Sequence, residues 1–350
     1  MRHLLRLGLA ALVGAIVVAG GQLPAHGAAG DLGGGSSAHD DAVAFWTPER
    51  VAAAVPRDFV YDPATGRFRQ VRATVAAALA AGAPATASRV TGSSWPGSAA
   101  VGTVRTTTGK VLFRMGGDYY VCSGSVLADR DPGRSLVVTA AHCAYDEVAR
   151  RFATEWTFIP DYDAAAVPLT TDGSFCASTR FGCWSARALV VDSVYAGAGG
   201  FTQQATRRDV AIAVVGAGGR SGAAQLDSTV GAQALSAATA RTRSDTYLFG
   251  YPQASPFTGA DLVYSRGPLG VDVLNAGKTY RVGSRMTGGA SGGPWFTPFS
   301  ASSGRGTQVS VTSYGYDGLP YLFGPIFGPS TSALVSAATT ATVDTVVRTG

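Results

Sequence analysis

Short runs of β-branched and aromatic residues, separated by glycine and proline, recur along the chain from about Ala99 to Phe327. Runs of this kind are typical of β-strands. We expect strands at Val101–Arg105, Lys110–Met115, Tyr119–Val121, Leu136–Thr139, Trp156–Ile159, Ala188–Val194, Val210–Val215, Thr246–Phe249, Leu262–Gly267, Gly270–Leu274 and Gln308–Ser313. Many short strands favour an all-β sandwich or barrel, and about 250 residues leave room for two small barrels.

Residues 1–28 have the pattern of a signal peptide. A basic start is followed by the uncharged apolar run Leu7–Ala19 and then by small residues. This run is too short for a comfortable membrane span, so the sequence predicts cleavage and export, with a retained anchor helix as the alternative.

Residues 29–98 contain no cysteine and differ in composition from the β-rich part of the chain. We expect a flexible linker at Gly33–Ser37, a helix with Thr47 as its N-cap, a second helix at Val71–Ala81 and an exposed linker at Ala83–Gly97. We interpret this zone as a pro-region on a cleavable linker. The alternative is an N-terminal extension that is never removed.

The β-rich part is predicted to divide into two barrels, at residues 99–240 and 241–350. The stretch Gly216–Ala240 is poor in aromatic residues and rich in small ones, as expected of a crossing between them. A closing helix is expected at Ser332–Ala341.

Charge and hydropathy argue against two classes of protein, nucleic-acid-binding proteins and membrane-attached proteins. The formal net charge is +5, but the arginines are scattered, so we expect a solvated surface and no nucleic-acid partner. No further long apolar run comes after the leader, so we expect no membrane attachment after processing.

All four cysteines fall in the β-rich part. An even number in an exported chain favours disulfides over a zinc site. Of the three possible pairings we favour Cys122–Cys143 and Cys176–Cys183, and we expect no metal ion or organic cofactor.

The segment Met286–Trp295 holds the candidate nucleophile, Ser291, among four glycines. Such a run can aim backbone N–H groups into one small hollow beside an exposed hydroxyl, which is what acyl transfer requires. The segment also matches the Gly-x-Ser-x-Gly elbow of α/β-hydrolases, but that fold places its histidine after the serine, and no histidine follows Ser291.

A serine nucleophile needs a base, and His142 is the candidate. The other three histidines lie in the leader or the pro-region. His142 ends the segment Val138–His142, where small residues leave room for the imidazole to face a cleft; the alternative is a structural histidine at a strand end. For the acid that orients it we favour Asp209, at the polar entry to an apolar strand, over Asp192 and Asp146.

These motifs resemble those of chymotrypsin-like (trypsin-like) serine peptidases, over about Val101 to Phe327. The matching segments, in the order that the family has them, are Cys122–Ser125, Thr139–Cys143, Asp209–Ala211 and Gly289–Pro294. The segment Phe249–Pro252 and the small pro-region are similar to the bacterial secreted branch that includes the glutamyl endopeptidases. The resemblance implies two antiparallel six-stranded barrels with the active site between them, and it also implies the Cys122–Cys143 bridge.

Carried over by motif, the resemblance makes His142 the general base and acid, Asp209 its orienting group and Ser291 the nucleophile. It places the N–H groups of Gly289 and Ser291 in the oxyanion hole. It also makes Val311–Gly315, with Ser313, Tyr314 and Gly315, the strand that pairs with the substrate and walls the specificity pocket.

Two positions depart from the family pattern. Ala290 stands where trypsin-type enzymes have the aspartate that pairs with the new N-terminus, so we expect removal of the pro-region to act by unblocking the cleft. Arg285 stands at the pocket floor where a trypsin has an acid, which disfavours cleavage after Lys or Arg. Arg285 could receive an acidic side chain or point to solvent, and Thr312 replaces the histidine of glutamyl endopeptidases.

The sequence therefore predicts a secreted, extracellular serine endopeptidase that acts on proteins or peptides. Its own pro-region is a candidate intramolecular inhibitor or chaperone. A catalytically silent relative that binds a partner through the same cleft is the main alternative, and an esterase of another fold is the second.

Overall fold

The structure is a computed structural model, and it describes residues 35–71, 92–96, 103–129, 131–162 and 175–349. The predicted signal peptide lies outside the described residues, as does all but the first residue of the helix predicted at Val71–Ala81. Among the helices within these ranges, none is both long and apolar enough to cross a membrane.

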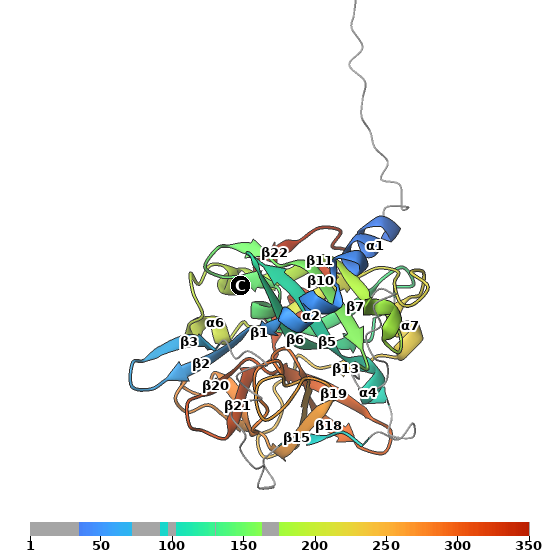
Figure 1. Ribbon diagram of the computed structural model, residues 1–350. Helices are drawn as coiled ribbons and strands as arrows, with labels where there is room; N and C mark the ends of the chain where they lie inside the picture. Colours follow the sequence, from blue (N-terminus) through green and yellow to red (C-terminus); the bar gives the residue numbers. More distant parts are fainter. Residues whose placement is uncertain (1–34, 72–91, 97–102, 130, 163–174, 350) are drawn as a thin grey trace, which may run out of the picture. The chain divides into compact units, whose positions relative to one another are not determined.

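The first half of the β-rich part is a closed barrel (Figure 1). Its strands are β5 (Thr108–Met115), β6 (Asp118–Leu127), β7 (Ser135–Thr139), β10 (Thr154–Pro160), β11 (Trp184–Asp192) and β12 (Ala211–Val215). They pair antiparallel in the order β6-β5-β10-β11-β12-β7, and β7 returns to β6 to close the ring. Closure removes the exposed strand edges that an open sheet would have.

The second half consists of two six-stranded sheets. One has the order β13-β19-β18-β14-β15-β4, and the other the order β16-β17-β21-β20-β2-β3. Their strands from this half are β13 (Ala234–Leu235), β14 (Asp245–Gly250), β15 (Val263–Pro268), β16 (Gly270–Val271), β17 (Thr279–Gly283), β18 (Pro294–Ser300), β19 (Arg305–Val311), β20 (Tyr314–Tyr316) and β21 (Tyr321–Pro325).

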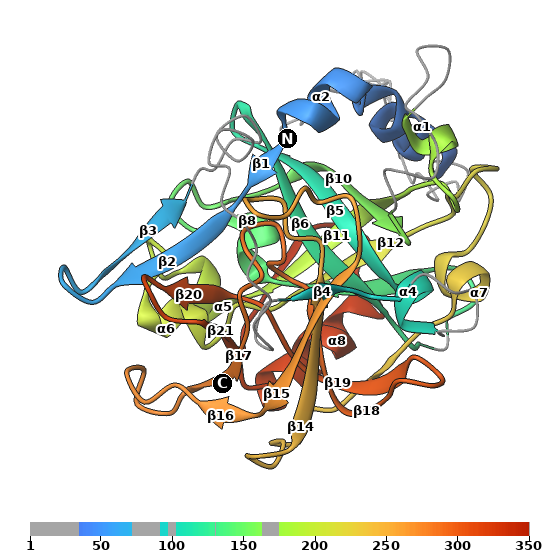
Figure 2. The ribbon, with the colours of Figure 1, turned by 60° about the horizontal axis from the view of Figure 1, so that its bottom comes forward.

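The N-terminal segment contributes to both halves. It contains α1 (Gly35–Phe45), α2 (Pro48–Ala53), β1 (Val55–Pro56), β2 (Asp58–Asp62), β3 (Arg67–Val71) and β4 (Ser93–Ser94). Strand β1 pairs parallel with β6 of the barrel, and β2 pairs parallel with β20 of the second half. Figure 2 shows the β2–β3 hairpin, in blue, beside β20 and β21.

The C-terminus returns to the barrel. Helix α8 (Pro329–Ala338) contacts β11 and β12, and β22 (Thr345–Val347) pairs with β11. Every residue of β12 is buried, because one face of the strand lines the barrel and the other lies under α8. This double cover explains why Ala211–Val215 is a continuous apolar run instead of an alternating one.

Short elements connect these strands. They are α4 (Thr103–Thr107), the 3-10 turns η2 (Ala141–Cys143) and η3 (Phe175–Ser178), β8 (Tyr145–Asp146), β9 (Arg151–Phe152), α5 (Ser193–Ala196), α6 (Gln203–Thr206) and α7 (Leu226–Val230).

The all-β expectation and most of the predicted strands are confirmed, with ends that differ by a few residues. The N-cap of Thr47 is also confirmed, since its side chain accepts a hydrogen bond from the Arg50 N–H. The helix predicted at Ser332–Ala341 begins three residues earlier, at Pro329.

Several expectations are wrong. Of the strand predicted at Val101–Arg105, the described part belongs to helix α4, in which the Thr107 hydroxyl bonds the carbonyl of Thr103. The linker predicted at Gly33–Ser37 enters α1 at Gly35. The linker predicted at Ala83–Gly97 contains β4, which pairs with β15.

Two predicted strands stop early for a common reason. Asp192 accepts a hydrogen bond from the Val194 N–H and so starts α5, and Asp272 accepts one from the Leu274 N–H. An aspartate that bonds the backbone two residues later turns the chain out of the extended conformation.

Candidate active site

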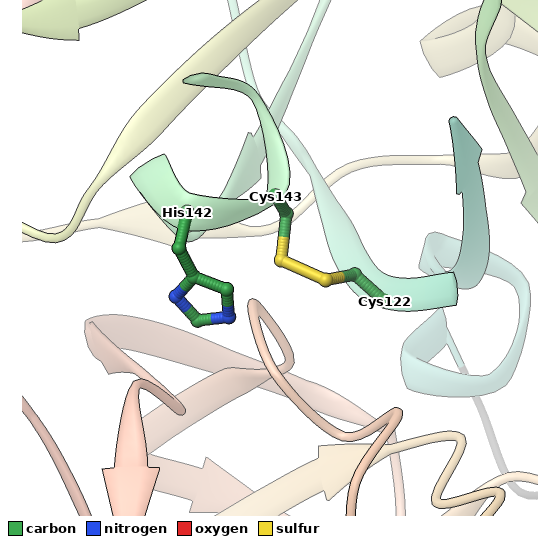
Figure 3. A group of neighbouring side chains, drawn as sticks. All are labelled: Cys122, His142 and Cys143. Atoms are coloured by element: carbon green, nitrogen blue, oxygen red, sulfur yellow. A yellow bond between two sulfur atoms is a disulfide. The ribbon is translucent and has the colours of Figure 1, made fainter. Parts of the chain in front are cut away.

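His142 lies on the turn that follows strand β7. Ala140 and Ala141 lead into it, and the imidazole is completely buried. Figure 3 shows the ring beside the Cys122–Cys143 disulfide, which joins this turn to β6. Because the two sulfur atoms are bonded to each other, this trio offers a metal ion only the imidazole.

Asp209, at the entry to β12, holds His142 through two hydrogen bonds. Its Oδ2 lies 2.8 Å from Nδ1 of His142, and its Oδ1 accepts the backbone N–H of the same residue at 2.9 Å. A carboxylate oxygen accepts hydrogen bonds, so Nδ1 of His142 is the donor in this pair. A third contact comes from Ser313, whose hydroxyl donates to Oδ2 of Asp209 at 2.5 Å.

The two other aspartates considered for this position make different contacts. Asp192 caps α5 and lies 3.8 Å from the guanidinium of Arg208. Asp146 accepts the N–H groups of Val148 and Ala149 in an exposed turn. Among the candidates, only Asp209 reaches the imidazole.

Ser291 lies in a tight loop that is tied to the barrel through Ser123. The Ser123 hydroxyl donates to the carbonyl of Gly289 at 2.8 Å, and its N–H donates to the carbonyl of Ser291 at 2.7 Å. Two glycines in this loop have positive φ, +101° at Gly289 and +80° at Gly292. A Cβ atom on Gly292 would lie 2.2 Å from the hydroxyl of Thr139, so only glycine fits this close approach.

Asp58, from the N-terminal segment, occupies the site between these groups. Its Oδ1 accepts the Ser291 hydroxyl at 2.6 Å, and its Oδ2 accepts the Gly289 N–H at 2.9 Å. Its carboxylate therefore bridges the predicted nucleophile and one of the predicted oxyanion donors. Nε2 of His142 is buried and has no hydrogen-bond partner among the described residues.

The cleft changes the acidity of Asp58. Desolvation raises the pKa of its carboxyl, and this effect outweighs the hydrogen bond from Ser291 and the charges of His142 and Arg57, which lower the pKa. In this position Asp58 holds its proton more tightly than an aspartate in water.

Phe59 covers the imidazole of His142. Its ring stacks on Phe201 with the centroids 4.0 Å apart, and it meets the ring of His142 edge-on at 5.5 Å. Together, Asp58 and Phe59 shield both the hydroxyl and the imidazole from solvent.

Comparison with known proteins settles the family. No known family model and no curated protein matches this sequence. Among solved structures, the protease Anisep from Arthrobacter nicotinovorans is 30% identical, with a TM-score of 0.56, over 68% of this chain and 98% of that protein. The thermostable serine protease AL20 from an extremophilic microorganism is 32% identical, with a TM-score of 0.55, over 68% of this chain and 100% of that protein.

The chain belongs to the bacterial chymotrypsin-like serine proteases. A Glu endopeptidase structure is 16% identical, with a TM-score of 0.51, over 71% of this chain and 97% of that protein, and it shows the shared fold alone. The expected fold class is thus confirmed, with the first barrel closed and the second half built from two sheets.

The predicted specificity residues of this protease lie beside Ser291. Arg285, Tyr314 and Gly315 line a hollow of about 330 Å³ that also reaches Thr312. Arg285 is exposed at this hollow. Ser313 does not line it, since its hydroxyl is directed to Asp209.

Both disulfides favoured from the sequence are present in this protease, Cys122–Cys143 and Cys176–Cys183. The residues that sequence analysis missed are Asp58, Phe59, Phe201 and the supporting Ser123, whereas Ser313 was predicted to bind substrate and instead contacts Asp209. No local pattern marks the first three, because only the folded chain brings a segment near residue 58 to a loop near residue 291. Ser123 lies inside the matched Cys122–Ser125 motif, and this motif was the one sequence signal that could have identified it.

Proposed function

We propose that the chain is a secreted serine endopeptidase that hydrolyses peptide bonds with Ser291 as nucleophile, His142 as base and Asp209 as the orienting acid. One observation carries the proposal: a carboxylate bridges the Ser291 hydroxyl and the Gly289 N–H. Two groups that contact one carboxylate lie close together, as an attacking oxygen and an oxyanion donor need to, and this supports the proposal.

In this mechanism His142 accepts the proton of Ser291 while the hydroxyl oxygen attacks the carbonyl carbon of the substrate. The oxyanion is stabilised by the N–H groups of Gly289 and Ser291, each worth about 3–4 kcal/mol. His142 then protonates the leaving amine, and a water molecule activated by the same ring hydrolyses the acyl-enzyme. Asp209 keeps Nδ1 protonated throughout.

We propose further that the chain is made as a latent precursor, with residues 55–71 as its intramolecular inhibitor. Strand β2 runs parallel to β20 and presents a side chain, Asp58, to the nucleophile. A carboxylate at this point leaves no peptide carbonyl for Ser291 to attack. Release of the segment would return the hydroxyl to Nε2 of His142.

Secretion is supported by the sequence of residues 1–28 and by the two disulfides, since exported chains keep such bonds oxidised. Proteins or peptides are the proposed substrates.

A fluorophosphonate probe tests the proposal, because it reacts with activated serines alone. We expect the processed protein to take up one label, on Ser291, and to cleave peptides. Ser291→Ala should lose both, with kcat falling by a factor on the order of 10⁶. A folded, processed protein that neither reacts nor cleaves would be a silent binding protein.

A further inference from the structure

A second residue of the N-terminal segment, Arg57, enters a pocket next to the catalytic turn. One guanidinium nitrogen donates to the carbonyl of His142 at 2.6 Å, and another lies 3.0 Å from Oε2 of Glu147. The Tyr195 hydroxyl donates to the same carboxylate oxygen at 3.1 Å. All three side chains are almost fully buried, with Arg57 5% exposed and Glu147 2% exposed.

The groups that receive Arg57 form a socket, defined here as the His142 carbonyl, the Glu147 carboxylate and the Tyr195 hydroxyl. Burial raises the pKa of Tyr195 well above its ordinary value, and the charge of Glu147 adds to this, so the hydroxyl stays a neutral donor. Burial lowers the pKa of Arg57, but the charge and hydrogen bond of Glu147, together with smaller contributions from neighbouring acidic groups, raise it by more, so the guanidinium stays charged. The carbonyl and the carboxylate therefore bind one cation, and the hydroxyl holds the carboxylate in place.

The socket is part of the protease and not of the segment that fills it. Glu147 follows β8 and Tyr195 lies in α5, both in the first half of the β-rich part. Glu147 forms an ion pair with Arg57 and with no other described residue. When the N-terminal segment leaves, a carboxylate loses its cation beside the catalytic histidine.

The surroundings make the vacated socket more acidic. With the segment docked, a hollow of about 370 Å³ next to the socket lies between this segment and three carboxylates of the protease, Asp118, Asp146 and Glu147. Arg57 is the only cationic residue among the described residues that line it. A site of this charge favours a cationic side chain and disfavours an anionic one.

The segment's path shows where the socket lies along the cleft. Phe59 pairs with β20 and lines the specificity pocket, whereas Pro56 pairs with β6 and does not line that pocket. Arg57 precedes Asp58 on the β6 side. If the specificity pocket takes the residue before the scissile bond, the socket faces the residues after it.

We propose that the socket of Glu147, Tyr195 and the His142 carbonyl is a substrate subsite for an arginine side chain in the first or second position after the scissile bond. This inference rests on the proposed function. In the precursor Arg57 fills the subsite, and in the processed enzyme a substrate guanidinium takes its place.

Paired substrates test the subsite. Two pairs of quenched fluorescent peptides are used, one pair for the first and one for the second position after the cleaved bond. The members of each pair differ only in carrying arginine or citrulline there; citrulline has nearly the same shape and no charge. We expect the processed enzyme to favour arginine at one of these positions by about tenfold or more in kcat/KM, since a charged hydrogen bond of this kind is worth at least that factor.

Variants of the socket residues then test whether the socket is the source of the preference for arginine. Glu147→Gln should reduce the arginine-to-citrulline ratio to within about twofold, and its circular dichroism spectrum, compared with that of the wild type, shows whether the variant folds. Tyr195→Phe should lower the ratio partly. Glu155→Gln removes the same charge from the same half of the protein, outside the socket, and should keep the wild-type ratio.

Equal rates within both pairs of peptides in the active wild type, or a preference that survives Glu147→Gln, would overturn the inference and leave the proposed function intact. If the processed protein cleaves nothing and Ser291 is not labelled, the proposed function has failed. Binding of the same peptides then decides the subsite: tighter binding of the arginine peptide supports the socket, and equal binding overturns it.

Discussion

The hydroxyl of Ser291 is directed at the carboxylate of Asp58 and not at the imidazole of His142. It donates to Asp58, while Nε2 of His142, within the described part of the chain, lacks a hydrogen-bond partner. The remaining contacts of the site are complete, since Asp209 accepts three hydrogen bonds from His142 and Ser313. In our proposal, only the removal of Asp58 separates this arrangement from a working triad.

Ser313 is a positioning residue in this account. Ser313→Ala removes one hydrogen bond to the Asp209 carboxylate, so we expect kcat/KM to fall by about tenfold with little change in KM. A less solvated carboxylate holds the imidazolium proton more tightly, so the acidic limb of the kcat/KM profile should move to higher pH. The measurement is that profile, recorded with a peptide substrate.

Ser310→Ala is the matched control. Its hydroxyl bonds the carbonyl of Pro325 at 2.7 Å in the adjoining strand, so its loss should affect stability and not the profile. Identical profiles for Ser313→Ala and the wild type would show that the third contact of Asp209 has no role in catalysis.

At this scale the sequence pointed to the three proposed reacting groups but not to most of the residues that contact them. His142, Asp209 and Ser291 stand in short motifs, and chain order excluded the α/β-hydrolase alternative. No local sequence motif identifies Asp58 and Phe59, because their partners lie far away in sequence and are brought near only by strand pairing.

At the scale of elements, the β2–β3 hairpin is the feature that sequence patterns did not predict. Residues 58–71 alternate only weakly between apolar and polar, and two strands alone are marginally stable. Pairing of β2 with β20 supplies the missing sheet. By contrast, the strongly apolar strands of the barrel and the Thr47 N-cap were predictable, because their signals are local.

Docking of β2 should depend on pH through Asp58. Desolvation raises the pKa of Asp58 in the docked state, so the docked form binds its proton more tightly than the free form. The stabilisation is therefore present at acidic pH and is lost as the pH rises through the docked-state pKa. For every pH unit by which the pKa of the docked form exceeds that of the free form, the docking equilibrium changes by about tenfold.

Amide hydrogen exchange of β2 in the intact precursor measures this. After correction for intrinsic exchange, we expect protection to fall as the pH rises, and to fall less in Asp58→Asn. The variant keeps the contributions of His142 and Arg57, the charged groups that act on Asp58, so the difference between the two proteins isolates the carboxyl. Parallel curves, or protection that rises with pH in the wild type, would contradict the proposed role of Asp58.

At the scale of the whole molecule, the two halves meet through Ser123, which links β6 of the barrel to the loop of Ser291. The order of motifs was enough to predict the fold class. It was not enough to predict that the N-terminal segment adds strands to both halves, because that depends on sheet edges that exist only after folding.

If release of the N-terminal segment is enough for activation, extra residues at the new N-terminus should have little effect on activity. Ala290 is buried against Gly250 and offers no carboxylate to an amino terminus. Adding three or four residues to the processed N-terminus should therefore change kcat/KM by less than about threefold, since no ion pair is lost. The comparison is between processed proteins with and without the extension, and a collapse of activity in the extended protein would reject release as the mechanism.

The most direct measurement is the mass of the protein during turnover. The processed enzyme is mixed with an ester or peptide substrate, quenched in acid within the first turnovers and measured intact, then digested to locate the modification. The account predicts a transient increase equal to the acyl portion of the substrate, on the peptide that contains Ser291, and none in Ser291→Ala. Product formation without such an adduct on Ser291, or with an adduct on another residue, would contradict it.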